Sequence, residues 1–265
     1  MDGITGNIAL EVKSLTVGYV HSKAGKIMIA EDINFSLAKG ELIGLVGANG
    51  IGKSTLLRTL TGLQPSLDGL VLLEGKDLRS YSNFQLASML SVVFTDPPAS
   101  KNLSVQEIVS LGRQPYTNWI GTLSPSDRKA IQFALEATET TVLAHKKCFE
   151  LSDGQMQRVS IARALAQDTP IIILDEPTTH LDLYHRAYVL KLLKNLATET
   201  NKTILFSTHE IDLAIQLSDK MIVMSPNGNF FDSPCQLIKG GKFDSLFPEK
   251  TIKFDPDTGR FTIRK

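Results

Sequence analysis

The stretch from Gly47 to Thr55 has the residue types and the spacing of a phosphate-binding loop. It reads GANGIGKST and fits the pattern G-x-x-x-x-G-K-[ST]. Glycines in such a loop let the backbone turn its N–H groups toward phosphate oxygens, and the N-terminus of the next helix adds partial positive charge. We expect Lys53 to reach the β- and γ-phosphates and the Ser54 hydroxyl to bind Mg²⁺. The pattern predicts a bound nucleoside triphosphate.

Two adjacent carboxylates form a second group that could do chemistry. Asp175 and Glu176 follow the apolar run 171–174, which is typical of a strand buried on both faces. Because open α/β sheets bind ligands at the carboxyl ends of their strands, we expect Asp175 to serve Mg²⁺ directly or through water. Glu176 would polarise the attacking water as general base. An acidic pair alone is more often a solvated turn, but the phosphate loop in the same chain favours the catalytic interpretation.

The elements around these residues alternate between strands and helices. Residues 42–46 predict a strand before the loop, and residues 54–60 predict a helix after it. Apolar patterns predict further strands at 9–17, 32–37, 70–73, 90–94, 171–174, 203–207 and 221–224, and helices at 83–89, 156–166, 182–197 and 210–217. The first two of these strands should form an antiparallel hairpin layer. The strand at 221–224 should close the sheet, and residues 254–263 predict a terminal hairpin.

Residues 95–150 have a different pattern. Capping boxes at Ser104 and Ser124 open amphipathic helices, and no strand pattern occurs. The fold class is therefore predicted as α/β: a P-loop NTPase core with a mainly parallel sheet, an N-terminal antiparallel β layer and an inserted helical lobe. We expect one domain over residues 1–265. Its predicted parts are a core of residues 1–94 and 159–225, a helical lobe of residues 95–158 and a C-terminal tail of residues 226–265.

Composition excludes several classes of protein. Lys+Arg and Asp+Glu are both 28, so the formal net charge is zero. The composition therefore does not indicate a protein that binds nucleic acid through an overall positive charge. The N-terminus lacks the pattern of a secretory signal, and no apolar run approaches the ~20 residues that span a bilayer. The two cysteines, Cys148 and Cys235, are far apart and fit no metal-binding spacing. These features predict a protein of the reducing cytosol.

Several further motifs stand in register with the phosphate loop. Residues 151–155 read LSDGQ and match the signature L-S-G-G-Q at all but one position. Residues 175–178 (DEPT) and 181–182 (LD) match the Walker B and D-loop segments, and His209 follows the strand at 203–207 as the switch histidine does. Over residues 9–225 the sequence thus resembles the ATP-binding cassette (ABC) ATPases, the motor subunits of ABC transporters.

The resemblance implies a role for each matching residue. Tyr19 would stack on adenine, Glu176 would act on the water, and His209 would hold the γ-phosphate and the water in line. Phosphate and Mg²⁺ contacts are implied for Gly47, Asn49, Gly50, Gly52, Lys53, Ser54 and Thr55, and a metal contact for Asp175. Ser152 and Gly154 are implied to bind the γ-phosphate of ATP held by a second copy of the chain, and Gln155 and Asp182 are also implied to bind nucleotide. One chain has one loop and one signature, so a complete site would need two chains arranged head to tail.

The chain departs from the family pattern at two positions. The family places a glutamine after the strand at 90–94, but this chain has Thr95 there. A threonine hydroxyl can bond a metal-bound water with a shorter reach, and we expect Thr95 to lie within one water of the metal. Asp153 replaces the third signature residue, a glycine, at a helix start where negative charge is favoured.

Residues 111–116 point to a subgroup of the family. They read LGRQPY and resemble the L-G-R-x-P-[HY] segment of ATPases that serve iron-siderophore, haem and vitamin B12 importers. A helix end with a proline stop would also explain Gly112 and Pro115. The resemblance implies an ATP- and Mg²⁺-dependent homodimer on the cytoplasmic face of the inner membrane, with a permease and, indirectly, an external substrate-binding protein as partners and no nucleic acid. The alternative is a non-transport ABC ATPase that acts on nucleic acid or ribosomes.

Overall fold

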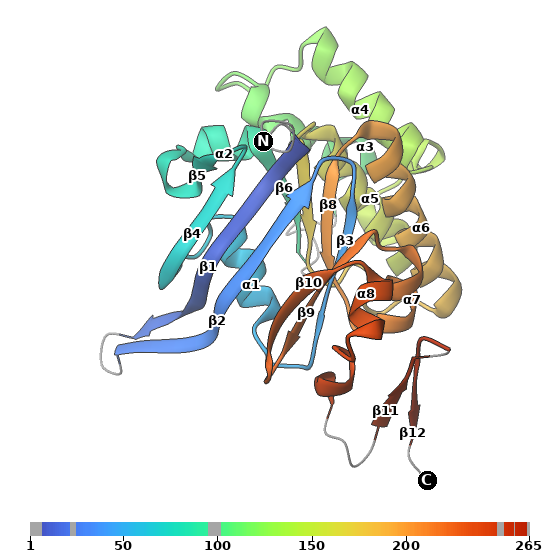
Figure 1. The fold of residues 1–265 in the computed structure, drawn as a ribbon. Coiled ribbons are helices and arrows are strands. Elements are labelled where there is room, and N and C mark those ends of the chain that lie inside the picture. Colours follow the sequence, from blue (N-terminus) through green and yellow to red (C-terminus); the bar gives the residue numbers. More distant parts are fainter. Residues whose placement is uncertain (1–6, 22–24, 95–101, 248–251, 257, 264–265) are drawn as a thin grey trace.

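The computed structural model describes residues 7–21, 25–94, 102–247, 252–256 and 258–263. Its centre is a six-stranded sheet in the order β10-β9-β3-β8-β7-β6 (Figure 1). The strands are β3 (Leu42–Gly47), β6 (Leu90–Val93), β7 (Ile171–Leu174), β8 (Thr203–Ser207), β9 (Lys220–Ser225) and β10 (Gly228–Asp232). The first five are mutually parallel. The mainly parallel sheet predicted from the apolar runs is confirmed.

One part of the predicted sheet is wrong. The strand at 221–224 does not close the sheet, because β10 turns back and pairs antiparallel with β9, from Gly228 opposite Ser225 to Asp232 opposite Met221. Every residue of β10 is only partly buried, whereas β9 is buried from Met221 onward. An edge strand is covered on fewer sides and so lacks the continuous apolar run of an interior strand. The sequence pattern therefore does not predict β10.

A second, antiparallel layer lies beside the central sheet and confirms the predicted hairpin. It consists of β1 (Ile8–His21), β2 (Gly25–Ala38), β4 (Asp68–Leu73) and β5 (Lys76–Asp77) in the order β2-β1-β4-β5. Both hairpin strands are longer than predicted, and Tyr19 lies within β1, opposite Ile27 of β2, rather than at its end. The extended hairpin therefore carries Tyr19 past the edge of the core.

The central sheet separates two hydrophobic cores. Alternate residues of β7 divide between them. Ile171 and Ile173 pack into the core shared with β1, β2 and helix α1 (Lys53–Leu60), while Ile172 and Leu174 pack into the core shared with the helical lobe. Side chains of a strand alternate between the faces of its sheet, so a strand buried on both faces needs an unbroken apolar run. This packing fixes where β7 ends, and hence where Asp175 and Glu176 lie.

The predicted inserted lobe is helical. It contains α3 (Val105–Ser110), α4 (Pro125–Ala137), the start of α5 (Asp153–Ala166), and the short 3-10 turns η3 (Leu111–Tyr116), η4 (Thr141–Leu143) and η5 (Cys148–Glu150). The capping boxes predicted at Ser104 and Ser124 are present, and a third, at Ser152, starts α5 three residues before the predicted helix start at residue 156. In the described residues of this lobe the only β pairing outside named strands is the bridge between Ser104 and Lys147. Helix α5 runs without a break from the lobe to the sheet.

The remaining helices cover the sheet and lead to the C-terminal hairpin. They are η2 (Leu78–Ser80), α2 (Asn83–Met89), α6 (Leu183–Thr200), α7 (Ile211–Leu217), α8 (Pro234–Lys239) and η6 (Asp244–Leu246). The predicted terminal hairpin exists as β11 (Ile252–Asp255) and β12 (Arg260–Ile263), a separate two-stranded sheet. Phe254 of β11 stacks on Phe243, with ring centroids 5.0 Å apart. Across the described part of the chain, no helix is both long and apolar enough to cross a bilayer.

Candidate functional site

The phosphate loop lies between the carboxyl end of β3 and the N-terminus of α1, as predicted. Gly52 is the N-cap of α1, and its φ of 111° lies in the left-handed region that glycine adopts without strain. A Cβ at Gly52 would also lie 2.6 Å from Cγ2 of Ile29. The loop conformation therefore depends on glycine at this position, and it leaves the first N–H groups of α1 without a side-chain cap.

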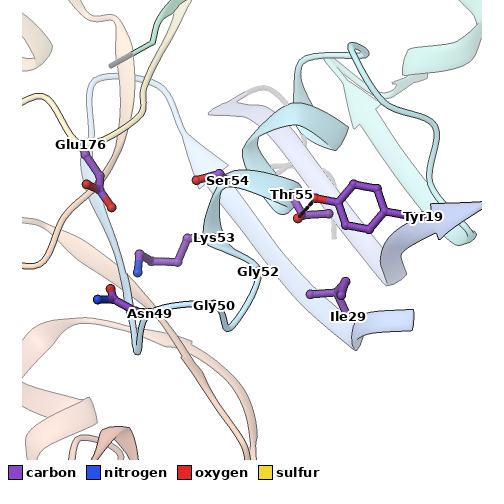
Figure 2. A pocket seen from close by; sticks show the side chains of 9 residues that line it. All are labelled: Tyr19, Ile29, Asn49, Gly50, Gly52, Lys53, Ser54, Thr55 and Glu176. Atoms are coloured by element: carbon purple, nitrogen blue, oxygen red, sulfur yellow. Dashed lines mark hydrogen bonds between the residues drawn. The ribbon is translucent and has the colours of Figure 1, made fainter. Parts of the chain in front are cut away.

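A pocket of about 390 Å³ opens over this loop (Figure 2). Its lining residues are Tyr19, Ile29, Asn49, Gly50, Gly52, Lys53, Ser54, Thr55 and Glu176. Of the lining residues only Ile29 was not singled out from the sequence. The volume is in the range of small-molecule sites, and an anion at the helix N-terminus would meet both N–H groups and the Lys53 ammonium.

Tyr19 and Ile29 form the apolar end of the pocket (Figure 2). The Tyr19 hydroxyl shares a hydrogen bond of 2.9 Å with Oγ1 of Thr55, which holds the ring near the first turn of α1. Tyr19 is 42% exposed and lines the pocket, where an aromatic ring can stack on a planar group. An aromatic ring at one end and a phosphate loop at the other match the two halves of a nucleotide.

Lys53 is held in place before any ligand binds. Its Nζ donates to the carbonyl oxygens of Gly47 at 2.9 Å and Ala48 at 3.4 Å. Burial lowers the pKa of the Lys53 ammonium, and the carboxylates of Glu176 and Asp175 oppose that shift. Phosphate oxygens would favour the charged form in the same way, so the charge is stabilised most when an anion occupies the loop.

We expect Lys53→Ala to weaken ATP binding by about 10- to 100-fold, because a charge-assisted hydrogen bond contributes about 1.5–3 kcal/mol. Titration with a fluorescent ATP analogue measures this change. Lys39→Ala is the matched control, since Lys39 is a surface residue whose ammonium pairs with Glu74 at 2.9 Å, outside the pocket. Equal affinities of the Lys53→Ala protein and the control would contradict the assignment of Lys53 to the phosphates.

Asp175 and Glu176 follow β7 as predicted and are tied to the neighbouring strand β8. The buried hydroxyl of Ser207 donates to Oδ1 of Asp175 at 2.6 Å and accepts from the backbone N–H of Glu176 at 2.9 Å. Sequence analysis missed Ser207 as part of the site, although its place at the end of the strand parallel to β7 is the signal that could have found it. One hydroxyl thus orients both carboxylate residues.

The Glu176 carboxylate is held at both oxygens. Oγ1 of Thr179 donates to Oε2 at 3.1 Å, and Nε2 of His209 lies 2.5 Å from Oε1. Glu176 has a φ of 49°, a left-handed conformation that is uncommon for a residue with a side chain and that clusters at functional sites. The structure thus brings His209 and Glu176 together, and Glu176 reaches the pocket at the phosphate end (Figure 2).

The signature residues lie elsewhere. Ser152 is the N-cap of α5, and its hydroxyl accepts from the backbone N–H of Gln155 in a capping box; Asp153 is the acidic residue of the first turn. Ser152, Gly154 and Gln155 are all described, and none of them lines the pocket of its own chain. Asp182 is the N-cap of α6, with a 66% exposed side chain. Thr95, predicted near the metal, lies outside the described residues.

The LGRQPY segment follows a helix end, since α3 ends at Ser110, and it also makes contacts that a helix end does not explain. Gly112 and Pro115 both lie inside the 3-10 helix η3. A Cβ at Gly112 would lie 2.3 Å from the carbonyl oxygen of Arg163, so only glycine allows η3 to approach α5 this closely. Arg113 is buried, donates from Nε to Oδ1 of Asp127 at 2.8 Å, and donates from Nη1 to the carbonyl oxygen of Ala166 at 2.8 Å. The segment joins α4 to the C-terminal end of α5.

Together the fold and the pocket define a nucleotide-hydrolysing P-loop domain with an inserted helical lobe. The sequence model described as "ABC transporter" matches residues 30–179, more than half of the chain. The chain belongs to the ABC transporter family as an ATP-binding subunit, and its enzymatic activity is that of an ABC-type ATPase.

Named relatives agree with this family. The chain is 40% identical to the achromobactin transport ATP-binding protein of Dickeya dadantii, over 90% of this chain and 87% of the relative. It is 37% identical to the petrobactin import ATP-binding protein FpuD of Bacillus anthracis, over 92% of this chain and 85% of the relative. Among solved structures, an ABC transporter of metal-chelate type in an inward-facing conformation is 30% identical, with a TM-score of 0.78 over 91% of this chain and 89% of that chain.

Proposed function

We propose that this chain is the ATP-hydrolysing motor subunit of an importer for ferric siderophores or a related chelate such as haem or cobalamin. Two copies would work with a membrane permease at the cytoplasmic face of the inner membrane, and an external substrate-binding protein would deliver the chelate. The names of the relatives support this substrate class: achromobactin, petrobactin, iron(3+)-hydroxamate and cobalamin import.

The proposal of a dimer rests on the position of the signature, residues 151–155, away from the pocket of its own chain. Ser152 and Gly154 stand at the N-terminus of a 14-residue helix, where a hydroxyl and orphan N–H groups can bind an anion, yet neither lines the pocket of its own chain. A second copy rotated head to tail would bring this turn to the γ-phosphate held by the first copy. A structure of a related cassette, 28% identical with a TM-score of 0.72, is dimeric.

Mg²⁺ fits the residues at the phosphate end of the pocket. Magnesium prefers oxygen ligands and is usually bound through one or two carboxylates together with substrate phosphates. The Ser54 hydroxyl and the Asp175 carboxylate would supply the protein oxygens, and the described residues contain no cluster of three His, Cys, Asp or Glu that would hold a metal without phosphate. The ion would neutralise charge on the phosphates when bound.

The roles of the remaining residues follow from their positions. Tyr19 would stack on adenine, the loop residues 47–55 would hold the phosphates, and Glu176 would take a proton from water while His209 and Thr179 fix its carboxylate. Asp182, exposed at the start of α6, would face the partner copy in the dimer.

Growth and co-purification together test the transport function. A strain lacking this gene should fail to grow with a ferric siderophore as sole iron source and should grow normally with excess iron salt. The wild-type gene and the Lys39→Ala gene should restore growth on the siderophore, whereas the Lys53→Ala gene should not. The tagged chain, expressed with its chromosomal neighbours, should bring down a membrane permease. Ribosomes or DNA in place of a permease would instead support the alternative of a non-transport ABC ATPase.

A further inference from the structure

His185 packs against the signature turn of its own chain, at a position that neither the motif pattern nor the pocket singles out. A Cβ at Gly154 would lie 2.9 Å from Cδ2, 3.4 Å from Cγ and 3.5 Å from Nε2 of His185. Real Cβ atoms almost never approach other heavy atoms to within 3.0 Å, so the imidazole occupies the space that any larger residue at 154 would need. Gly154 is consequently buried under the His185 ring.

The imidazole is fixed from its other side by the N-cap of α6. Oδ1 of Asp182 accepts from both the backbone N–H and Nδ1 of His185, each at 2.8 Å. The hydrogen bonds from the backbone and ring of His185 hold the pKa of Asp182 below its ordinary value, so Asp182 is a carboxylate at neutral pH. A carboxylate can only accept, which places the hydrogen on Nδ1. With Nδ1 held by Asp182, the Cδ2 edge of the ring faces Gly154.

A second contact repeats this arrangement one turn along both helices. Arg158 lies four residues after Gly154 on α5, and Tyr188 lies three residues after His185 on α6; the Arg158 guanidinium sits 5.5 Å from the centroid of the Tyr188 ring. Arg158 also donates from Nη1 to the carbonyl oxygen of Glu139 at 3.1 Å. Residues three or four apart share one helix face, so the two pairs bring the first two turns of α5 and α6 together.

We propose that His185 is a positioning residue for the signature turn: held by Asp182 and packed on Gly154, it sets where Ser152 and Gly154 present their donors to the γ-phosphate of ATP bound by a second copy of the chain. The inference rests on the proposed dimer. Because His185 does not line the pocket of its own chain, its loss should spare ATP binding by the monomer and weaken the ATP-dependent pairing of two chains.

The test uses the full chain carrying Glu176→Gln, in which bound ATP should persist. His185→Ala should raise the ATP concentration at half-maximal dimer formation by roughly 10- to 100-fold, the size of effect that misplacing a positioning group produces. ATP affinity of the monomer should stay within about twofold. His185→Gln, which can form a capping box with Asp182, should recover part of the loss. His145→Ala is the matched control, an exposed histidine of the helical lobe.

A double-mutant cycle separates positioning from a general loss of stability. Gly154→Ala should impair dimer formation less in the His185→Ala chain than in the chain with His185, because removing the imidazole makes room for the new methyl group. A dimer midpoint of His185→Ala equal to that of the His145→Ala control, or strictly additive effects in the cycle, would overturn the role of His185 alone. No ATP-dependent dimer in the Glu176→Gln parent would overturn the proposed dimer and the inference with it.

Discussion

Glu176→Gln should lower ATP turnover by about 100- to 10,000-fold, the contribution of a general base to the barrier. The amide has nearly the same shape as the carboxylate but cannot take a proton from water. Thr179 and His209, which hold the two carboxylate oxygens, should still hold the Gln side chain, so ATP should bind as in the wild type. Steady-state phosphate release measures the turnover, and ATP titration measures the binding.

ATP that is bound but not hydrolysed should also hold two copies of this variant together as a dimer. We expect a dimer by size-exclusion chromatography with ATP and a monomer with ADP. The matched control is Glu199→Gln, an exposed glutamate on α6 that should retain wild-type turnover. Full ATPase activity in Glu176→Gln would remove Glu176 as the base.

Asp127→Ala should lower the free energy of unfolding by about 3–5 kcal/mol, the usual effect of removing one partner of a buried ion pair. The side chains of Arg113 and Asp127 are only 9% and 4% exposed, and Nε of Arg113 lies 2.8 Å from Oδ1 of Asp127. Without Asp127 the guanidinium stays buried beside the carbonyl oxygen of Ala166 and under the Tyr116 ring, whose centroid is 4.0 Å away. Urea unfolding at neutral pH measures the loss.

The same pair predicts a dependence on pH. The Ser124 hydroxyl, its backbone N–H and the Arg113 guanidinium hold the pKa of Asp127 below its ordinary value of 3.8. Because the folded pKa is the lower one, the stabilisation is complete above about 3.8 and is lost as the pH falls through the folded pKa. The stability difference between wild type and Asp127→Asn should therefore narrow only below pH 4.

An exposed ion pair provides the control for both measurements. Arg79 and Asp77 lie 2.7 Å apart, with the Arg79 side chain 66% exposed. Pairs in this setting contribute little because water screens the charges, so Arg79→Ala should leave urea unfolding unchanged. A stability loss in Asp127→Ala no larger than in Arg79→Ala would contradict the structural role of the buried pair.

The motifs that bind and cleave nucleotide are predictable from sequence because each is local. In the phosphate loop, the strand before it, the glycines and the helix start follow one another within about twenty residues, and α1 and β3 form there. The run 171–174 predicted β7 to the residue, since a strand buried on both faces leaves an unbroken apolar signal. Capping boxes located the starts of α3 and α4 for the same reason, whereas α5 begins three residues before its predicted start.

Contacts between distant segments could not be predicted in this way. Ser207 joins Asp175 and Glu176 across 31 to 32 residues of chain, and only the pairing of its strand with β7, which the local sequence does not contain, marks it as part of the site. Arg113 is a charged residue, and such side chains are rarely fully buried; only the approach of α5 and α4 encloses it. The segment that forms β10 has no continuous apolar run, so its sequence alone does not predict a strand. Its pairing with β9 shows that it is one.

Helix α5 is attached at its C-terminal end, and this attachment limits how the signature turn at its N-terminal end can move. Its C-terminal end is tied to the sheet side of the molecule: Arg163 donates to the carbonyl oxygen of Val92, and Gln167, directly after the helix, donates to those of Ala87 and Leu90. A rotation of the helical lobe about this attachment would make α5 a lever arm with its pivot beside β6. Over 14 residues it is about 21 Å long, so a 10° swing about that pivot carries the signature turn by about 4 Å. A small rotation of α5 at the end of β6 would therefore move the signature turn, at the other end of the helix, by more than the length of a hydrogen bond.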